Sequence, residues 1–112
     1  WRDPEDWMGQ HFFTGGIMPT VGLIRQFSDL FTVEEEWRWS GTHYQRTALQ
    51  WLKLFDTNRA RIDPILERAY GAQAGIWRRR WRMFFLATAE SFGFNNGGSW
   101  GVNHYRLRPA LT

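Results

Sequence analysis

Residues 74–92, AGIWRRRWRMFFLATAESF, contain the most regular pattern in the chain. Their large apolar side chains recur at steps of three and four residues, which places them on one face of an α-helix. The pattern predicts a helix over 74–92 with a stripe formed by Trp77, Trp81, Phe84, Phe85, Thr88 and Phe92. The sequence Asn95-Asn96-Gly97-Gly98 predicts the end of this helix, because Asn and Gly favour turns.

The same stretch carries four arginines, at positions 78, 79, 80 and 82. Basic residues interleaved with Trp are typical of nucleic-acid-binding surfaces, where cations meet phosphates and aromatic rings stack on bases. On a helix, however, Arg78 and Arg82 share one face, while the aromatic stripe occupies another. The spacing therefore favours a solvated basic face, or one that faces lipid headgroups.

Upstream of this helix, the sequence predicts a loop, a helix and a strand. Residues 1–20 mix Gly and Pro with aromatic residues, as a structured loop with aromatic anchors does. Thr20 is a suitable N-cap for an amphipathic helix that reaches about Phe31. Residues 32–40 have the pattern of an edge-exposed strand, and the acidic residues 34–36 are interpreted as its solvated face.

Two more helices and a last strand follow from the remaining sequence. Residues 42–61 place apolar residues at helical spacing, with Thr42 as the cap. Pro64 is expected to start a short helix that ends at Gly71. Residues 100–107 predict a final strand, which Pro109 closes.

The composition narrows the possible classes of protein. The chain has 112 residues, of which 43% are hydrophobic and 18% aromatic, enough for one globular domain. The absence of Cys excludes disulfides, thiolate metal sites and catalysis by a Cys of this chain. A net charge of +3 suits an acidic partner, either nucleic acid or anionic lipid. Apolar runs are far too short to cross a membrane, so any membrane contact is expected to be peripheral.

No motif in the chain is a self-sufficient active site. The histidines at 11, 43 and 104 are too scattered for a metal site. The acidic residues include no evident pair for general-acid and general-base work. Gly15 and Gly16 belong to no phosphate-binding motif and are interpreted as a sharp turn. Because the chain begins at Trp1 without an initiator Met, a missing upstream segment is expected.

Three blocks, taken together, resemble the cyclopropane-fatty-acid synthase and mycolic-acid cyclopropane synthase family. The first is Trp7 followed by FFTGGIMPT at 12–20, and the second is GTHYQRT at 41–47, completed by Trp51. The third is FFLATAESFGF at 84–94 followed by WGVNHY at 100–105. Their order and separation also agree with the family, and the resemblance is greatest to a bacterial branch of cyclopropane-fatty-acyl-phospholipid synthases.

The resemblance implies an α/β fold class and a class I methyltransferase fold. The chain would be its C-terminal part, mainly helical with one small antiparallel strand pair. Residues 1–112 would form the lipid-facing part of the methyltransferase domain, and the N-terminal part that binds S-adenosylmethionine would be absent.

The function that the resemblance implies is methylation or cyclopropanation of double bonds in phospholipid acyl chains. The parent enzyme would use S-adenosylmethionine and bicarbonate, whereas this fragment would bind no cofactor and be inactive alone. Its expected partners are phospholipid acyl chains at a membrane surface and the missing N-terminal half of the same protein. Nucleic acid is not an expected partner, and a homo-oligomer is possible. The expected location is cytoplasmic, peripheral to the inner membrane surface.

The family motifs also assign roles to individual residues. Tyr44 matches the family tyrosine whose hydroxyl contacts bicarbonate, and it is the expected catalytic residue. Thr88 stands where many members have a Cys, which favours methyl transfer over ring closure; packing is its ordinary role on an apolar stripe. The expected substrate-binding residues are Phe13, Gly15, Gly16, His43, Thr88, Phe92 and His104, although the aromatic ones and His104 also suit a structural role.

A function of another class stays open from the sequence. The chain would then be a stand-alone basic, Trp-rich module that holds anionic lipid or nucleic acid through its arginine face and exposed Trp residues.

Overall fold

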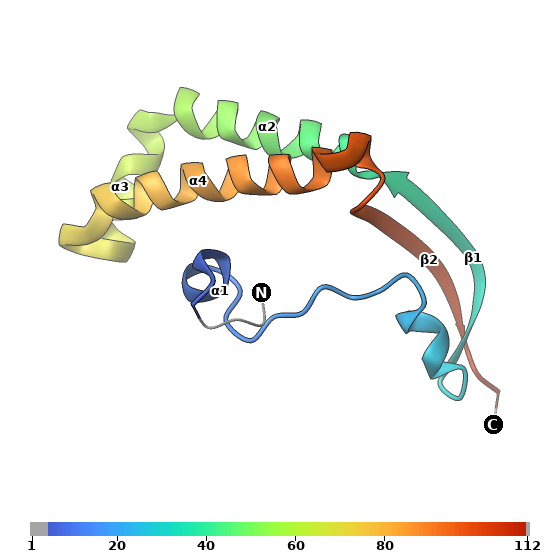
Figure 1. Ribbon diagram of the computed structural model, residues 1–112. Coiled ribbons are helices and arrows are strands. Elements are labelled where there is room, and N and C mark those ends of the chain that lie inside the picture. The colour runs from blue at the N-terminus through green and yellow to red at the C-terminus, as the bar shows by residue number, and fades with distance from the viewer. Residues whose placement is uncertain (1–4, 112) are drawn as a thin grey trace. The chain divides into compact units, whose positions relative to one another are not determined.

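The computed structural model describes residues 5–111. Most of them are helical, and the two strands form one antiparallel sheet, as the sequence predicted (Figure 1). In chain order the main elements are α1 (Trp7–His11), a 3₁₀ helix (Leu23–Phe27), β1 (Phe31–Ser40), α2 (Gly41–Thr57), α3 (Arg59–Tyr70), α4 (Ala74–Gly93) and β2 (Gly101–Pro109). Further 3₁₀ turns span Gly71–Gln73 and Phe94–Gly97.

The chain divides into two compact units. We call residues 38–102 the helical unit, because they contain α2, α3 and α4. The described residues up to Trp37, with those from Asn103 onward, form the strand unit, which holds most of β1 and β2. The expectation of one domain over 1–112 stays a prediction.

In the helical unit, α2 and α4 lie side by side (Figure 1). Small side chains occupy their contact: Ala48 is fully buried, and Thr88 and Ala89 are nearly so. Because interhelical distance depends on side-chain size at the contact, these residues let the helices approach closely. The helix predicted over 74–92 is confirmed.

Two glycines bring the N-terminus of α2 against the C-terminal end of α4. A Cβ atom at Gly41 would overlap the carbonyl oxygens of Phe92 and Trp100, and one at Gly93 would overlap the side chain of Gln45. The contact at Gly41 therefore requires a residue without a side chain, because backbone carbonyls lie there, whereas the flexible Gln45 side chain beside Gly93 can move aside.

The end of α4 is confirmed where the sequence predicted it. Asn95 and Asn96 both have φ of 53°, and Gly97 has φ of 78°. Asn and Gly are the residues that adopt this left-handed region at least cost. The chain turns there and enters β2.

The boundaries around α2 and α3 correct the prediction. Ser40, rather than Thr42, is the N-cap of α2, and its hydroxyl accepts a hydrogen bond from the Thr42 amide. α2 ends at Thr57, because the Asn58 amide and side chain both donate to the Leu54 carbonyl. α3 begins at Arg59, so Pro64 lies inside the helix instead of starting it.

The helix predicted from Thr20 to Phe31 is wrong. Only a 3₁₀ helix over Leu23–Phe27 forms there, and no side chain caps it. Most apolar residues of the segment stay exposed, among them Val21, Phe27 and Leu30, the last by 59%. Helical spacing stabilises a short helix only when its apolar face is buried, and this face is not.

The loop predicted over residues 1–20 also needs correction, although residues 1–4 lie outside the described part. Residues 7–11 form α1, which Asp6 caps by accepting a hydrogen bond from the Gly9 amide. Gly15 and Gly16 do form the predicted turn: Gly15 has φ of 70°, and the Gly16 amide donates to the Phe13 carbonyl.

Both predicted strands are confirmed, with Pro109 as the last residue of β2. The acidic residues of β1 are not simply solvated, however. Glu34 forms ion pairs with Arg106 and Arg108, while Glu36 pairs with Arg25 and accepts a hydrogen bond from Asn103. The Arg25 hydrogen bond lowers the pKa of Glu36. Sequence neighbours alone could not reveal these partners, since they come from distant positions.

Candidate functional site

Tyr44 lies at the centre of an aromatic cluster between α2 and α4. The centroid of its ring is 4.4 Å from that of Phe92 and 5.8 Å from that of Trp51, both edge-to-face. Further along the same contact, Phe85 lies 6.3 Å from Trp51 and 5.6 Å from Phe55. Such edge-to-face pairs are favourable because the positive edge of one ring meets the negative face of the other.

The helical period explains why these residues meet. On α2, Tyr44, Ala48, Trp51 and Phe55 follow one another at steps of four, three and four residues, which gives one face. On α4, residues 81, 85, 88 and 92 have the same steps. The two faces pack against each other along the helix contact.

The hydroxyl of Tyr44 has no hydrogen-bond partner among residues 5–111, and the side chain is half-buried. It is therefore available to a ligand as a donor or an acceptor. The bicarbonate contact that the family resemblance implies for this hydroxyl stays a prediction.

Four of the predicted site residues lie on α2 and α4. Tyr44 and Phe92 are in contact, and Thr88 is buried. His43 is exposed, with its ring centroid 5.6 Å from that of Trp39. Their roles in binding or catalysis stay predictions.

The other predicted site residues belong to the strand unit. Phe13, Gly15 and Gly16 form the turn after α1, and His104 is an exposed residue of β2. Tyr44 and its aromatic neighbours on α2 and α4 belong to the helical unit.

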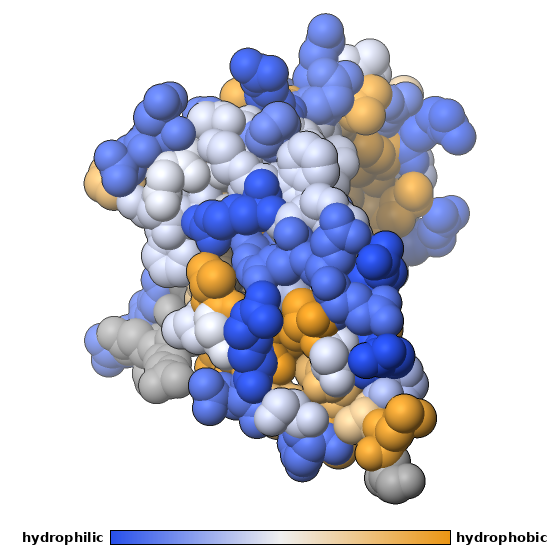
Figure 2. Space-filling view, turned by 90° about the vertical axis from the view of Figure 1, so that its right-hand side faces the viewer, coloured by the Kyte–Doolittle hydropathy of each residue, from blue (hydrophilic) through white to orange (hydrophobic). Residues whose placement is uncertain are grey.

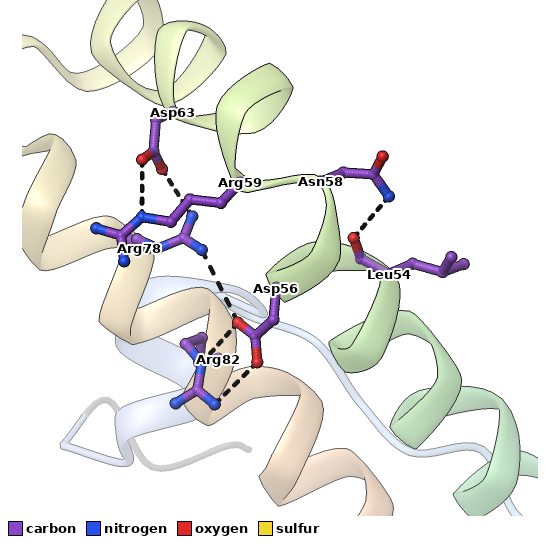
Figure 3. A network of polar contacts seen from close by, with 7 residues as sticks. All are labelled: Leu54, Asp56, Asn58, Arg59, Asp63, Arg78 and Arg82. Atoms are coloured by element: carbon purple, nitrogen blue, oxygen red, sulfur yellow. Dashed lines mark hydrogen bonds and ion pairs between the residues drawn. The ribbon is translucent and has the colours of Figure 1, made fainter.

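An ion-pair network joins α4 to α2 and α3 (Figure 3). Arg78 on α4 lies 2.7 Å from an oxygen of Asp63 and 3.8 Å from one of Asp56. Arg82 donates two hydrogen bonds to Asp56, at 2.9 and 3.0 Å, and Arg59 pairs with Asp63. The hydrogen bond from Arg82 lowers the pKa of Asp56 and raises that of Arg82.

The network corrects the prediction of a solvated basic face. The Arg78 side chain is only 12% exposed, and its guanidinium lies 4.8 Å from the centroid of the Phe55 ring. The sequence signals the Arg59–Asp63 pair through its four-residue spacing. It gives no comparable signal for the partners of Arg78 and Arg82, which come from other helices.

A groove of about 550 Å³ opens beside the aromatic cluster, within the helical unit. Most of its lining is apolar, and Asn58 and Arg61 supply the polar side chains. The full lining is Trp51, Leu54, Phe55, Asn58, Arg61, Ile62, Ile65 and Phe85. A volume of this size is in the range of small-molecule sites.

Metal-ligand clusters and membrane-spanning helices are absent from the described part of the chain. Across residues 5–111, His, Asp and Glu nowhere gather in threes as potential metal ligands. None of the helices described is both long and apolar enough to cross a bilayer. The glycines with positive φ among residues 5–111 are at 15, 71 and 97, and none of them lies in a turn that leads from a strand into a helix.

Known proteins resemble the chain in sequence. (S)-Coclaurine N-methyltransferase of Thalictrum flavum subsp. glaucum is 35% identical over an alignment of 107 positions, which covers 91% of this chain and 30% of that enzyme. The cyclopropane-fatty-acyl-phospholipid synthase of Escherichia coli K12 is 26% identical over 99 residues, 78% of this chain and 26% of the enzyme. No protein-family model matches the chain.

The fold is similar to a solved structure as well. A crystal structure of coclaurine N-methyltransferase, bound to N-methylheliamine and SAH, matches 96% of this chain with a TM-score of 0.81 and 34% identity. The match covers 33% of that enzyme, so the chain spans about a third of the length of its relatives. The chain is therefore homologous to S-adenosylmethionine-dependent methyltransferases and has the C-terminal part of a class I methyltransferase fold.

Proposed function

We propose that this chain supplies the acceptor-binding wall of an S-adenosylmethionine-dependent methyltransferase, and that the acceptor is an amine nitrogen. The observation that carries the proposal is the contact of Tyr44 with Phe92 and Trp51. Methyl transfer to a neutral amine creates an ammonium ion, and aromatic faces attract such a cation. The relatives named as N-methyltransferases support the same acceptor.

Within this proposal, the residues of the helical unit bind and orient the acceptor. The rings of Tyr44, Phe92 and Trp51 stabilise the developing positive charge and exclude water from it. The unpartnered hydroxyl of Tyr44 fixes the acceptor by a hydrogen bond. The donor, bound by another part of the enzyme, supplies an electrophilic methyl group.

A second acceptor is the double bond of a phospholipid acyl chain. Its methylation would create a carbocation, which aromatic walls also stabilise. Similarity to the E. coli cyclopropane synthase and the apolar groove beside Trp51 favour this acceptor. Ring closure would then need a base, for which bicarbonate held by Tyr44 is the candidate. Under this second proposal, the enzyme is cytoplasmic, lies on the inner membrane surface and acts as a homo-oligomer.

The stand-alone basic module receives less support. Its binding face would use Arg78 and Arg82, and both are already paired with carboxylates of α2 and α3. A phosphate would have to displace Asp56 or Asp63 from them.

A chimera tests the proposed acceptor. The part of coclaurine N-methyltransferase that matches this chain is replaced by residues 1–112, and transfer of a radiolabelled methyl group is measured on an amine and on an unsaturated phospholipid. We expect methylation of the amine by the chimera and no transfer by the chain alone. Binding of SAH to the chimera verifies that its donor-binding part is folded.

Each alternative has its own outcome in this assay. Methylation of the phospholipid but not of the amine selects the second acceptor. A chimera that binds SAH but methylates neither substrate contradicts the acceptor-binding role. Methyl transfer by the 112-residue chain alone overturns its expected inactivity.

A further inference from the structure

Arg61 differs from the arginines around it. Arg59, Arg78 and Arg82 all form ion pairs, and these occupy Asp56 and Asp63 (Figure 3). Arg61, by contrast, has no carboxylate within ion-pair distance among residues 5–111. It is exposed and lines the groove between α2, α3 and α4.

The rest of the groove cannot neutralise Arg61. No acidic residue contributes to its lining. The side-chain nitrogen of Asn58 donates to the Leu54 carbonyl at 2.8 Å, which leaves its amide oxygen as an acceptor (Figure 3). The groove therefore presents one cation at the edge of an aromatic and aliphatic surface.

We propose that this groove binds a monomeric amphiphile with an apolar body and a carboxylate end. The guanidinium of Arg61 pairs with the carboxylate, because its planar N–H groups match two carboxylate oxygens. The apolar body covers Ile62, Ile65 and Phe85, and its removal from water drives binding. The groove shares Trp51 with the proposed acceptor wall. Binding of the amphiphile itself requires no methyl donor and no methyl transfer.

The occupant is a single molecule rather than a membrane surface. The groove, of about 550 Å³, has room for one small ligand and is open to solvent, so it would cover one side of that ligand. A bilayer would instead need an extended basic surface, whereas three of the arginines in this region are already paired.

Calorimetric titration of the 112-residue chain tests the site with three probes of equal chain length. These are decanoate, decanol and decyltrimethylammonium, each below the concentration at which it forms micelles. We expect decanoate to bind tightest and decyltrimethylammonium weakest. Added salt should weaken only the binding of decanoate, since screening acts on the ion pair.

Two variants and a matched control locate the interaction. Arg61→Gln should weaken decanoate about fivefold, the upper range for an exposed ion pair, and leave decanol unchanged. Ile65→Ala, at a position 53% exposed, should weaken both ligands without loss of helix by circular dichroism. Arg79→Gln is the control, because Arg79 is exposed on α4 and does not line the groove.

Several results would overturn the proposal. One is equal binding of decanoate and decyltrimethylammonium, and another is an equal loss of decanoate affinity in Arg61→Gln and Arg79→Gln. Binding to vesicles with anionic lipid, without binding of decanoate, would assign the surface to a membrane instead. These readouts need no enzyme activity, so they fail separately from the proposed function.

Discussion

Gly41 and Tyr44 show how much depends on single residues at the start of α2. Gly41 has no side chain, and only this allows the Phe92 and Trp100 carbonyls to lie against it. Tyr44 can then place its ring against Phe92. The close backbone contact at Gly41 thus supports the aromatic contact on which the proposed acceptor site depends.

Replacing Gly41 by Ala should destabilise the protein by about 2 kcal/mol or more, because the new methyl group forces the backbone apart. Gly75→Ala is the matched control: it lies in α4 with open space around it, and should stabilise by about 0.5 to 1 kcal/mol. Urea unfolding followed by circular dichroism measures both. Equal effects of the two substitutions would contradict the close contact at Gly41.

Two substitutions of Tyr44 distinguish its packing role from its proposed role in the reaction. Tyr44→Phe should change the free energy of unfolding by less than about 0.5 kcal/mol, because the hydroxyl has no partner among the described residues. Tyr44→Ala removes the ring and should cost about 2 kcal/mol. In the chimera, Tyr44→Phe should still lower kcat about tenfold or more. Unchanged kcat in this variant would show that the hydroxyl has no role in the reaction.

Among the elements, the three helices of the helical unit are joined by both apolar and ionic contacts. Arg78 reaches Asp56 at the end of α2 and Asp63 in α3, and Arg82 holds Asp56 with two hydrogen bonds. These contacts connect the helices close to the turn at Asn58, where α2 ends and α3 begins.

The helix contacts should depend on pH in the acid range. The hydrogen bond from Arg82 lowers the pKa of Asp56 in the folded state below its unfolded value. The Arg82–Asp56 interaction therefore stabilises the fold fully at pH values above the unfolded-state pKa of Asp56, about 4. This stabilisation is lost as pH falls through the folded-state pKa. NMR titration of the Asp56 carboxyl measures this pKa directly.

A variant series links that pKa to stability. Asp56→Asn should reduce the acid-range pH dependence of the melting temperature, because this group no longer titrates. Glu67→Gln is the matched control, because it also removes one carboxylate but breaks no ion pair among the described residues. If Asp56→Asn retains the wild-type pH dependence, the ion pair with Arg82 does not contribute to stability.

For the whole molecule, incomplete burial is the main feature. Among residues 5–111 no large side chain is fully buried, and many large hydrophobic residues are exposed, including Trp37, Leu54 and Met83. Figure 2 shows hydrophobic patches between hydrophilic ones on the face that it draws. The stability of the chain should therefore differ between its parts.

Hydrogen exchange tests this difference. Amides in the middle of α2 and α4 should exchange at least about tenfold more slowly than those of residues 12–30. The former have regular helical bonds beside buried residues, whereas the latter form a few isolated turns. Uniform exchange along the chain would contradict the uneven burial.

The sequence by itself determined α4 with its aromatic stripe, the turn after it and both strands. Each follows from local periodicity or from residues that tolerate a left-handed backbone, and the family resemblance added the fold class. Only the tertiary structure decided that Ser40 caps α2, that the Thr20 helix does not form and that Arg78 is paired. These outcomes depend on partners distant in sequence, because burial and charge pairing outweigh local preference wherever the two disagree.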